Sequence, residues 1–582
     1  MNSDGDATRD DGLTWIVAPA VAVLLALLSA AVVFWQNARL GVLWDLSYVL
    51  ESAYRIALGD VPYRDFPFPF PPLTFFIQAG LIKLTGRVFF HHVIYCAVMN
   101  AMATLLTWRI VLRVSYGVKF DRTIALLLIL PLPVLDVYSI LPHPFYDPDA
   151  TVAVLAAVLL LLHFERETRS ALRGVITGAA VVVPLFIKQN TGLAFLFSTT
   201  TAIVLLLIIA AVRRQPWKQY ASVLIGTALT LFCALALIHF TAGLNNYWHW
   251  TIRFAAARRT PQRSAMLDIY RDSLLKWWLL LFVAGVVVAR LNRDLNKIFS
   301  IIPALLWSIP FLWSAVYLVR DSDASERAER LLALWPYVLV VSFCVALIAL
   351  IREQTPSKVL AFILIATVNG AFLSQQLWGS TYALWPLFMI LIAATLLNAK
   401  TLLKTDSLPP LLFTVLASAS LCVSGVSYVR SHERLDYADL DDGDLQHSSL
   451  PALKGLAMRG SFIPDFEELV SFSNKEIPLT DGILMLPGED LFYYATGRRP
   501  RFPVLMFDHT LDPYTSVELV QVARDRNINW LIVKDELQLE TEPVENREEL
   551  LDLLMKDFEE YESLNNYEIY RRKQENIGDD GP

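Results

Sequence analysis

Apolar residues occupy most of the first 430 positions in long runs, and short polar segments separate these runs. A helix needs roughly 20 apolar residues to cross a bilayer. The pattern predicts about thirteen membrane-spanning helices, near residues 14–36, 88–112, 123–140, 150–164, 173–187, 192–211, 220–241, 274–290, 298–318, 332–351, 358–375, 382–398 and 409–428. The first run is too long for the apolar part of a signal peptide and follows an acidic segment, so it is predicted to be a retained anchor.

Two further helical patterns lie between the first two spans, in residues 36–90. Leu43–Gly59 and Pro72–Gly86 are each too short or too polar to cross the bilayer. We therefore expect both to lie at the membrane interface. Three aromatic side chains of the first helix are expected to contact the lipid headgroups: Trp44, Tyr48 and Tyr54.

The long apolar runs stop after about residue 430. Beyond that point the pattern predicts strands at Ile483–Leu486 and Trp530–Val533, and helices at Pro464–Ser473, Ser516–Arg526 and Glu548–Tyr561. The fold class predicted for the chain is an α-helical polytopic membrane protein with a small C-terminal α/β domain.

Charge divides the chain at the same place. Residues 431–582 hold 15 basic and 33 acidic residues, a net charge of −18, whereas residues 1–430 hold 34 basic and 23 acidic residues, a net charge of +11. Hydrophobic residues make up 55% of the chain, and its mean hydropathy is +0.45. These values exceed those of ordinary soluble domains. The charge division indicates a basic membrane part joined to an acidic, water-soluble domain.

Short loops rich in Lys and Arg mark the cytoplasmic side of a membrane protein. With the N-terminus inside, the inner loops are all short and basic, and they hold Arg113, Lys119, Arg122, Arg166, Arg169, Arg173, Arg213, Arg214, Lys218, Arg290, Arg293, Lys297, Arg352, Lys358, Lys400 and Lys404. An odd number of spans then places the acidic domain outside. The predicted organisation is a cytoplasmic tail at 1–13, a transmembrane domain at 14–430 and an extracytoplasmic domain at 431–582.

Ionisable residues at membrane depth are costly and are candidate functional groups. Asp45 directly follows the first span, and Asp147 and Asp149 lie between two later spans. Lys188 lies at another outer boundary, so all four residues face the same compartment. A carboxylate there accepts a proton from a hydroxyl group, and a cation neutralises a leaving phosphate.

Each of these residues also has a structural interpretation. Asp45 would cap the helix that follows it, and Asp147 and Asp149 would cap the span near residue 150. Lys188 would only extend towards the lipid headgroups. The sequence leaves both kinds of interpretation open.

The third outer segment, Gly243–Asp272, is rich in Arg and Trp. Its arginines are candidates to bind one phosphate, or lipid headgroups in general: Arg258, Arg259 and Arg263. Three histidines are either structural or ligands of a divalent metal: His91, His92 and His143. No cofactor is expected, with a divalent metal kept as the alternative, and no nucleotide-binding or metalloprotease motif occurs.

The first outer loop carries a family resemblance. Asp45-x2-Tyr48…Gly59-x-Val61-Pro62-Tyr63-Arg64-Asp65-Phe66…Pro71-Pro72-Leu73 resembles the corresponding loop of GT-C class glycosyltransferases, among them the bacterial aminoarabinose transferases, protein O-mannosyltransferases and Rgt-type enzymes. The resemblance extends loosely over residues 14 to about 215. Pro487-Gly488-Glu489-Asp490…Tyr493-x3-Gly497-Arg498-Arg499-Pro500 resembles their outer domains. Many members have two adjacent acids after the first span, whereas Leu46 follows Asp45 here.

The resemblance implies inverting transfer of one sugar from a polyprenyl-phosphate donor to a glycan, lipid or protein acceptor, at the outer face of a bacterial plasma membrane. The catalytic position maps onto Asp45, with a second acid at Asp147 or Asp149. The expected phosphate-binding residues are Lys188, Arg258, Arg259 and Arg263. The expected supporting residues are Glu51, Arg55, Arg64, Asp65 and His143. The two arginines are second choices for binding the phosphate, and the alternative is that they only order the loop by pairing with Glu51 or Asp65. No nucleic-acid partner is expected.

Two other classes of protein would also fit a charged, polytopic chain. A transporter or flippase of a lipid-linked or anionic substrate uses intramembrane charges, and a membrane scaffold would display the acidic domain. Transporters usually place their sites near the bilayer midplane and often contain internal repeats. Here the acids gather at one face and no repeat is evident. These features favour the glycosyltransferase.

Overall fold

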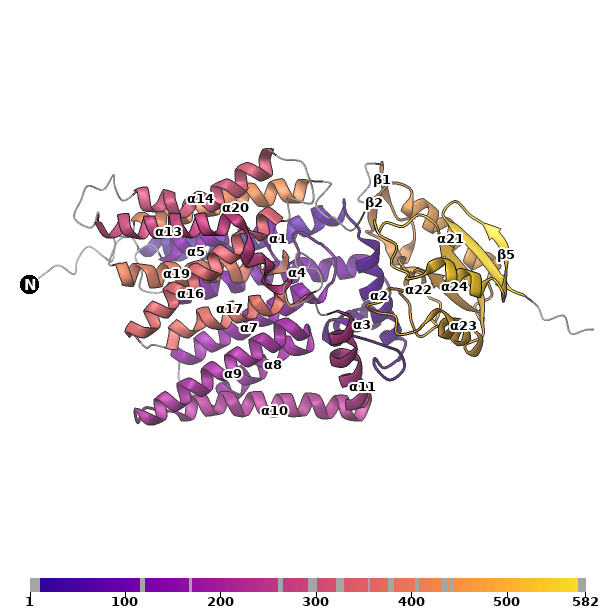
Figure 1. Ribbon diagram of the computed structural model, residues 1–582, viewed down its shortest axis with the longest axis horizontal. Coiled ribbons are helices and arrows are strands. Elements are labelled where there is room, and N and C mark those ends of the chain that lie inside the picture. Colours follow the sequence, from indigo (N-terminus) through magenta and orange to yellow (C-terminus); the bar gives the residue numbers. More distant parts are fainter. Residues whose placement is uncertain are drawn as a thin grey trace, which may run out of the picture.

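The structure is a computed structural model that describes residues 11–115, 121–166, 170–259, 265–291, 301–320, 329–353, 356–374, 382–403, 408–431, 438 and 443–573. Figure 1 shows a helical bundle at one end of the molecule and a smaller domain with a sheet at the other. The helices run roughly along the long axis that joins these two parts.

Ten helices among the described residues are long and apolar enough to span a bilayer. They coincide largely with α1 (Asp11–Asn37), α4 (Phe89–Val114), α7 (Tyr146–Arg166), α9 (Gln189–Val212), α10 (Lys218–Thr241), α13 (Ser273–Leu291), α14 (Ile301–Arg320), α16 (Leu334–Glu353), α19 (Trp385–Leu403) and α20 (Leu408–Arg430). Their exposed side chains include many large apolar ones, as expected of surfaces that face lipid. The predicted polytopic membrane fold is confirmed.

Three of the thirteen predicted spans are shorter or broken. The segment near 123–140 forms α5 (Asp121–Ile129) and the single turn α6 (Leu132–Leu135), because Pro131 and Pro133 interrupt the helix. The segment near 173–187 forms α8 (Ala171–Val182) and the 3-10 turn Val183–Phe186. The segment near 358–375 forms the 3-10 turn Pro356–Val359 and α17 (Leu360–Phe372).

The first outer segment forms the two expected helices, α2 (Leu43–Ala57) and α3 (Leu73–Thr85). Their predicted placement at the headgroups is wrong for two of the three aromatic anchors, since Tyr48 is 8% and Tyr54 is 5% exposed. Tyr54 donates a hydrogen bond to the carbonyl of Gly497, 2.8 Å away in the C-terminal domain. Figure 1 shows α2 between the helical bundle and the C-terminal domain, which covers one side of this helix.

The third outer segment forms a chain of short elements that leads from α10 to α13. These are α11 (Leu244–Trp248), the π-helical turn His249–Phe254, α12 (Ala255–Arg258) and the 3-10 helix Ala265–Arg271. Tyr247 packs edge-on against Tyr63 with ring centroids 5.1 Å apart. The contact ties this segment to the first outer loop.

The C-terminal domain contains the predicted α/β elements. Its main sheet has the order β3-β4-β6-β5, in which β3 and β4 are parallel and the other neighbours are antiparallel. The strands are β3 (Gly482–Leu486), β4 (Ile528–Lys534), β5 (Phe558–Ser563) and β6 (Tyr567–Arg572), and a separate hairpin-like pair is formed by β1 (Leu445–His447) and β2 (Ala457–Arg459).

Helices cover both faces of this sheet. One face packs with α23 (Ser516–Asp525) and α24 (Arg547–Leu554) in one apolar cluster, and the other packs with α21 (Phe462–Glu476) and α22 (Phe492–Thr496) in the core that continues into the membrane part. The predicted helix at 548–561 is wrong in its second half, which forms β5. Pairing with β6 overrides the local preference of the Glu-rich segment.

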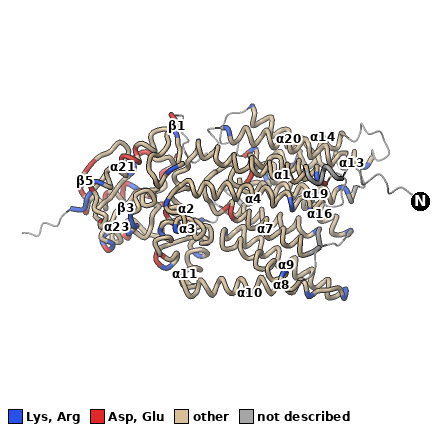
Figure 2. The backbone as a smooth tube through the Cα atoms, turned by 180° about the vertical axis from the view of Figure 1, so that it is seen from behind, with Lys and Arg blue, Asp and Glu red and all other residues tan. Residues whose placement is uncertain are grey.

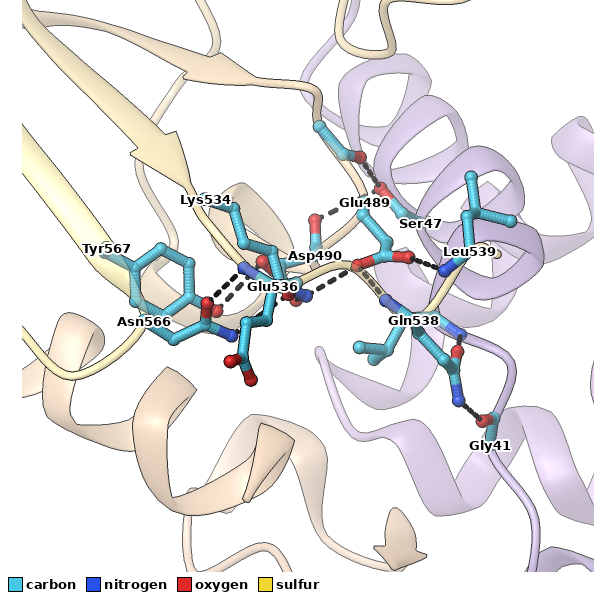
Figure 3. Close-up of polar contacts among 12 residues, drawn as sticks. Gly41, Ser47, Glu489, Asp490, Lys534, Glu536, Gln538, Leu539, Asn566 and Tyr567 are labelled. Atoms are coloured by element: carbon cyan, nitrogen blue, oxygen red, sulfur yellow. Dashed lines mark hydrogen bonds and ion pairs between the residues drawn. The ribbon is translucent and has the colours of Figure 1, made fainter. Parts of the chain in front are cut away.

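A buried polar network joins the C-terminal domain to the first outer loop (Figure 3). Lys534, at the end of β4, donates to Glu489 at 2.6 Å and to Asp490 at 3.0 Å. Gln538 accepts from the amide of Leu43 at 2.7 Å and donates to the carbonyl of Gly41 at 2.8 Å. These contacts hold the start of α2 against the domain.

Ser47 on α2 extends the same junction. Its hydroxyl lies 2.8 Å from the carbonyl of Gly488 and 3.1 Å from that of Asp490. Gly488 has φ +89, and a Cβ there would lie 1.8 Å from the carbonyl oxygen of Leu505. Only glycine allows the loop to approach so closely.

Candidate active site

Asp147 and Lys188 form a buried ion pair at the end of the membrane part that faces the C-terminal domain. Asp147 lies in the first turn of α7, and Lys188 is the extended residue between the 3-10 turn Val183–Phe186 and α9. Each is 5% exposed. The Lys188 ammonium donates to the Asp147 carboxylate and lies 5.7 Å from the centre of the Tyr146 ring. The structure thus brings together two of the predicted site residues.

Arg259 adds a second cation to this pair. It follows α12, and its guanidinium lies 4.2 Å from the centre of the Phe70 ring. It also interacts with the Tyr146 hydroxyl and with the Asp147 carboxylate. Asp147 is therefore opposed by two cations from two different outer segments.

Asp45 reaches the same tyrosine from α2. Its carboxylate is half-buried and interacts electrostatically with the Tyr146 hydroxyl, as Asp147 does. Val42, not Asp45, occupies the N-cap position of α2. Asp45 lies in the first turn, where a negative charge favours the helix dipole. The structure therefore does not support Asp45 as the cap of this helix.

Asp149 has a different environment from Asp147. Its carboxylate accepts hydrogen bonds from Thr74 at 2.7 Å, Tyr95 at 2.8 Å and Tyr138 at 2.7 Å. These donors come from α3, α4 and the segment after α6. Asp149 also lies inside α7, which begins at Tyr146, so neither it nor Asp147 caps a helix starting near 150. Its three hydroxyl donors satisfy this carboxylate, and so Asp149 ties α7 to α3, α4 and the segment after α6.

Aromatic rings enclose this group of charges. Tyr146 lies 5.2 Å from Phe70 and 6.4 Å from Tyr48 between ring centroids. Phe70 belongs to the alternating segment Phe66-Pro67-Phe68-Pro69-Phe70, which runs beside α2 and α3. Gln189 donates to the carbonyl of Pro69 at 3.3 Å and joins this loop to α9. The rings exclude water from the ion pair and so strengthen its electrostatic interactions.

The other predicted arginines do not all lie in this group. Arg258 donates to the carbonyls of His509 at 2.8 Å and Asp512 at 2.6 Å, so it binds the C-terminal domain. Arg263 lies outside the described residues. Arg55 pairs with Asp60 at 2.8 Å, so its expected pairing with Glu51 or Asp65 is wrong.

Arg64 does pair with Asp65, at 2.9 Å, and both side chains are substantially exposed. Glu51 is buried at the junction with the C-terminal domain, where one oxygen accepts from the amide of Tyr494 at 3.0 Å. Its second oxygen has no partner within the described part of the chain. Burial raises the pKa of Glu51 to about 8. None of these three residues touches the Asp147–Lys188 pair.

The histidines are held in three separate environments. His91 is hydrogen-bonded to Thr85 at 2.8 Å, and His92 to Gln78 at 2.7 Å. His143 is buried, and burial lowers its pKa to about 3, which leaves the ring neutral. No three His, Cys, Asp or Glu side chains cluster as metal ligands among the residues that the structure describes.

Tyr146 and Asp136 escaped the sequence analysis, and Tyr48 was expected at the lipid headgroups rather than in this site. Tyr146 and Tyr48 look like ordinary aromatic residues beside charged ones, and only the fold brings them together. Asp136 lies within a predicted span and accepts from Ser29 at 3.2 Å and Thr104 at 2.5 Å. An aspartate in an apolar run is a signal that could have been noticed.

Comparisons with known proteins test the fold. No family model and no curated protein sequence matches this chain. The crystal structure of the Archaeoglobus fulgidus oligosaccharyltransferase in complex with zinc and sulfate matches with a TM-score of 0.51 at 12% identity, over 88% of this chain and 68% of that one. This chain has a GT-C-like fold.

The structure of ArnT from Cupriavidus metallidurans bound to undecaprenyl phosphate is a second match to this GT-C-like chain. Its TM-score is 0.45 at 12% identity, and the match covers 96% of this chain and 98% of that one. The resemblance stated from the first outer loop is confirmed at the level of the fold. At such identities the function rests on the geometry of the site.

Proposed function

We propose that this chain is a membrane glycosyltransferase that transfers a sugar from a polyprenyl-phosphate donor to an acceptor. The observation that carries the proposal is the buried Asp147–Lys188 pair opposed by Arg259, beside Asp45 and Tyr146. A GT-C-like fold and ArnT, whose structure holds undecaprenyl phosphate, support a lipid-linked donor.

The roles follow from the charges. Lys188 and Arg259 bind the donor phosphate, since cations in a water-poor site stabilise the charge that develops on a leaving phosphate. Asp147 orients the Lys188 ammonium, and Asp149 holds Asp147 in place through its three hydroxyl donors. Asp45 is the general base, because it is the half-buried carboxylate that can reach an acceptor from outside.

The proposed reaction is a single displacement. The acceptor oxygen forms a bond to the anomeric carbon while the bond from that carbon to the phosphate oxygen breaks. The acceptor proton moves to Asp45, and the polyprenyl phosphate leaves with its charge held by Lys188 and Arg259. Attack from the side opposite to the leaving phosphate inverts the anomeric configuration.

The orientation belongs to the same proposal. The short loops predicted to be cytoplasmic include the ends of α9 and α13, away from the C-terminal domain (Figure 2). We place that end on the cytoplasmic side of a bacterial plasma membrane. The site and the C-terminal domain then lie on the outer side. Exported activity of reporter fusions after Arg430 and Pro582 is the expected result, and cytoplasmic signals from both fusions contradict it.

The test of the reaction is a transfer assay with purified protein in nanodiscs, using a panel of labelled polyprenyl-phosphate sugars. Asp45→Asn keeps the side-chain shape but removes the proton-accepting group, so turnover is expected to fall by about 10²–10⁴. Asp268→Asn is the matched control, since this exposed carboxylate lies on the same outer segment as Arg259 and pairs with the exposed Arg271 at 2.8 Å. Wild-type protein that transfers no sugar from any donor, but moves such lipids across the bilayer, would favour the transporter.

A further inference from the structure

A groove lies in the membrane part, away from the proposed active site. It has a volume of about 610 Å³ and lies between α13, α14, α16, α19 and α20. Its wall is mostly apolar and includes Phe282, Trp307, Phe311, Val341 and Phe413. Hydrocarbon is the ligand that such a wall favours.

Most polar groups of the wall are hydrogen-bonded to other groups of the wall. The hydroxyls of Ser342 and Thr395 are hydrogen-bonded at 2.7 Å. Tyr337 donates to the carbonyl of Trp307 at 3.3 Å, and the Trp307 ring nitrogen donates to that of Phe282 at 3.2 Å. Gly285 allows this close approach, because a Cβ there would lie 2.5 Å from the Trp307 ring nitrogen. The groove therefore offers few polar groups along its length.

Two arginines interrupt this apolar lining. Arg290 and Arg352 both line the groove, and each lies in the last turn of its helix, α13 and α16. Both side chains are exposed. Neither guanidinium has an ion pair or hydrogen bond with any other residue in the described ranges. Two such cations on one groove are complementary to a single anionic group.

The arginines lie at the end of the membrane part away from the proposed active site. Near the beginning of α13, the Tyr270 hydroxyl donates to Asn369 at 2.7 Å. Close by on α17, Leu373 accepts from Asn190, which is two residues beyond Lys188. The start of α13 is thus at the active-site end, and Arg290, in its last turn, is at the opposite end.

The groove is long enough for an acyl chain. On α16 its lining runs from Tyr337 to Arg352, fifteen residues that correspond to about 22 Å at the helical rise of 1.5 Å per residue. The hydrocarbon core of a whole bilayer is about 30 Å thick. The groove is therefore shorter than the bilayer core, and one of its ends carries the two arginines.

We propose that this groove binds an anionic phospholipid from the leaflet opposite the C-terminal domain. One acyl chain lies along the apolar wall, and the phosphate lies between Arg290 and Arg352. A donor chain alone would leave the two arginines unexplained, because the donor phosphate belongs at Lys188, at the other end. The choice of a phospholipid over the donor chain rests on the proposed function, whereas the groove and its two arginines are a different set of residues.

The experiment is native mass spectrometry of delipidated protein after incubation with equal amounts of phosphatidylglycerol or phosphatidylcholine. Wild-type protein is expected to retain phosphatidylglycerol preferentially. The double variant R290Q/R352Q is expected to bind it at least about tenfold more weakly, the smallest loss for one charge-assisted hydrogen bond. The control R214Q/K218Q removes two exposed charges outside the groove, one from the loop after α9 and one from the start of α10, and is expected to behave as wild type.

Val286→Trp tests the groove without changing charge. Val286 is half-buried in the wall, and the larger ring would fill the space of the acyl chain. This variant is also expected to lose phosphatidylglycerol, while its melting temperature reports whether it is folded. The proposal is overturned by equal retention of the two lipids, or by equal loss in R290Q/R352Q and the control. Competition for the groove by undecaprenyl phosphate, abolished in Val286→Trp, would instead assign the groove to the donor chain.

Discussion

Lys188 and Lys534 are both buried against carboxylates, yet their surroundings differ. Lys534 faces two acids, Glu489 and Asp490, at 2.6 and 3.0 Å. The remaining acceptor positions of these acids are filled from within the domain, since Glu489 accepts from two backbone amides and Asp490 accepts from the Tyr567 hydroxyl at 2.9 Å. Burial alone would lower the pKa of Lys534, but Asp490 and Glu489 outweigh it and raise the pKa above its usual value.

At Lys188 the cations outnumber the acids, whereas at Lys534 the acids outnumber the cation. Lys188 and Arg259 both act on one carboxylate, that of Asp147. The three residues come from three separate outer segments, whereas Lys534 and its acids come from the ends of two adjacent strands. A network in which acids exceed bases and are satisfied by amides needs no ligand. A pair of cations sharing one acid favours the arrival of another anion.

Lys534→Met is expected to have the largest effect, and it tests whether the Lys534 network has a structural role. It would leave Glu489 and Asp490 buried without their cation, which costs about 3–5 kcal/mol. We expect the C-terminal domain to unfold or detach at a markedly lower temperature, as measured by thermal unfolding in nanodiscs with limited proteolysis. Lys475→Met is the control, because that ammonium is 81% exposed in its pair with Glu476. A melting temperature equal to wild type contradicts a structural role for the network.

Lys188→Met should instead affect turnover. Loss of one charge-assisted contact to the donor phosphate costs about 1.5–3 kcal/mol, or roughly ten- to a hundredfold in rate. We expect little change in melting temperature, because Arg259 still opposes Asp147. The measurement is kcat for each folded molecule, with Lys83→Met as an exposed lysine on α3 for comparison. Unchanged turnover with a large loss of stability would place Lys188 in the same class as Lys534.

Glu51→Gln sharpens the comparison through pH. Burial raises the pKa of Glu51 from about 4.5 to about 8, so the folded chain retains a proton that the unfolded chain has already lost within that window. The stability contributed by Glu51 is thus complete below pH 4.5 and lost as pH rises through 8. Gln stays neutral across this range, so it avoids the cost of ionising a buried carboxyl group as pH rises.

We therefore expect Glu51→Gln and wild type to have the same melting temperature near pH 4.5. As pH rises towards 8, the melting temperature of the variant should exceed that of wild type by a growing margin. Melting temperatures across this range give the test. Asp65→Asn is the control, since its carboxylate is outside the junction and pairs with the exposed Arg64. A difference that shrinks as pH rises contradicts the assigned burial of Glu51.

The sequence predicts the membrane class because its signal is local. Each span needs only an apolar run, and the strands β3 and β4 and the helix α23 carry equally local patterns. The second half of the predicted helix at 548–561 failed because its conformation depends on pairing with β6, which no local pattern records.

The candidate site was predictable in its residue types but not in its partners. Asp147 and Lys188 stand out as charges at membrane depth, yet 40 residues separate them and only the fold joins them. Asp147 and Asp149 are indistinguishable in the sequence. The three hydroxyl donors that satisfy Asp149 lie on segments whose packing the sequence does not reveal.

Arg258 and Arg259 are neighbours in the sequence, but one contacts the C-terminal domain and the other lies in the candidate site. Arg258 donates to the carbonyls of His509 and Asp512, whereas Arg259 faces Asp147 and Tyr146. Arg258→Gln removes two hydrogen bonds at a partly exposed interface and should cost about 0.5–1.5 kcal/mol. We expect a small drop in melting temperature and a turnover within a few fold of wild type.

Arg259→Gln is the variant matched to Arg258→Gln, since it makes the same substitution at the next residue. It is expected to leave the melting temperature near that of wild type and to weaken use of the donor, because the second cation at Asp147 is lost. The comparison is made from donor KM and kcat of both variants in the same nanodiscs. Equal effects of the two variants on donor KM would mean that both arginines bind the phosphate, and the contact of Arg258 with the C-terminal domain would then be secondary.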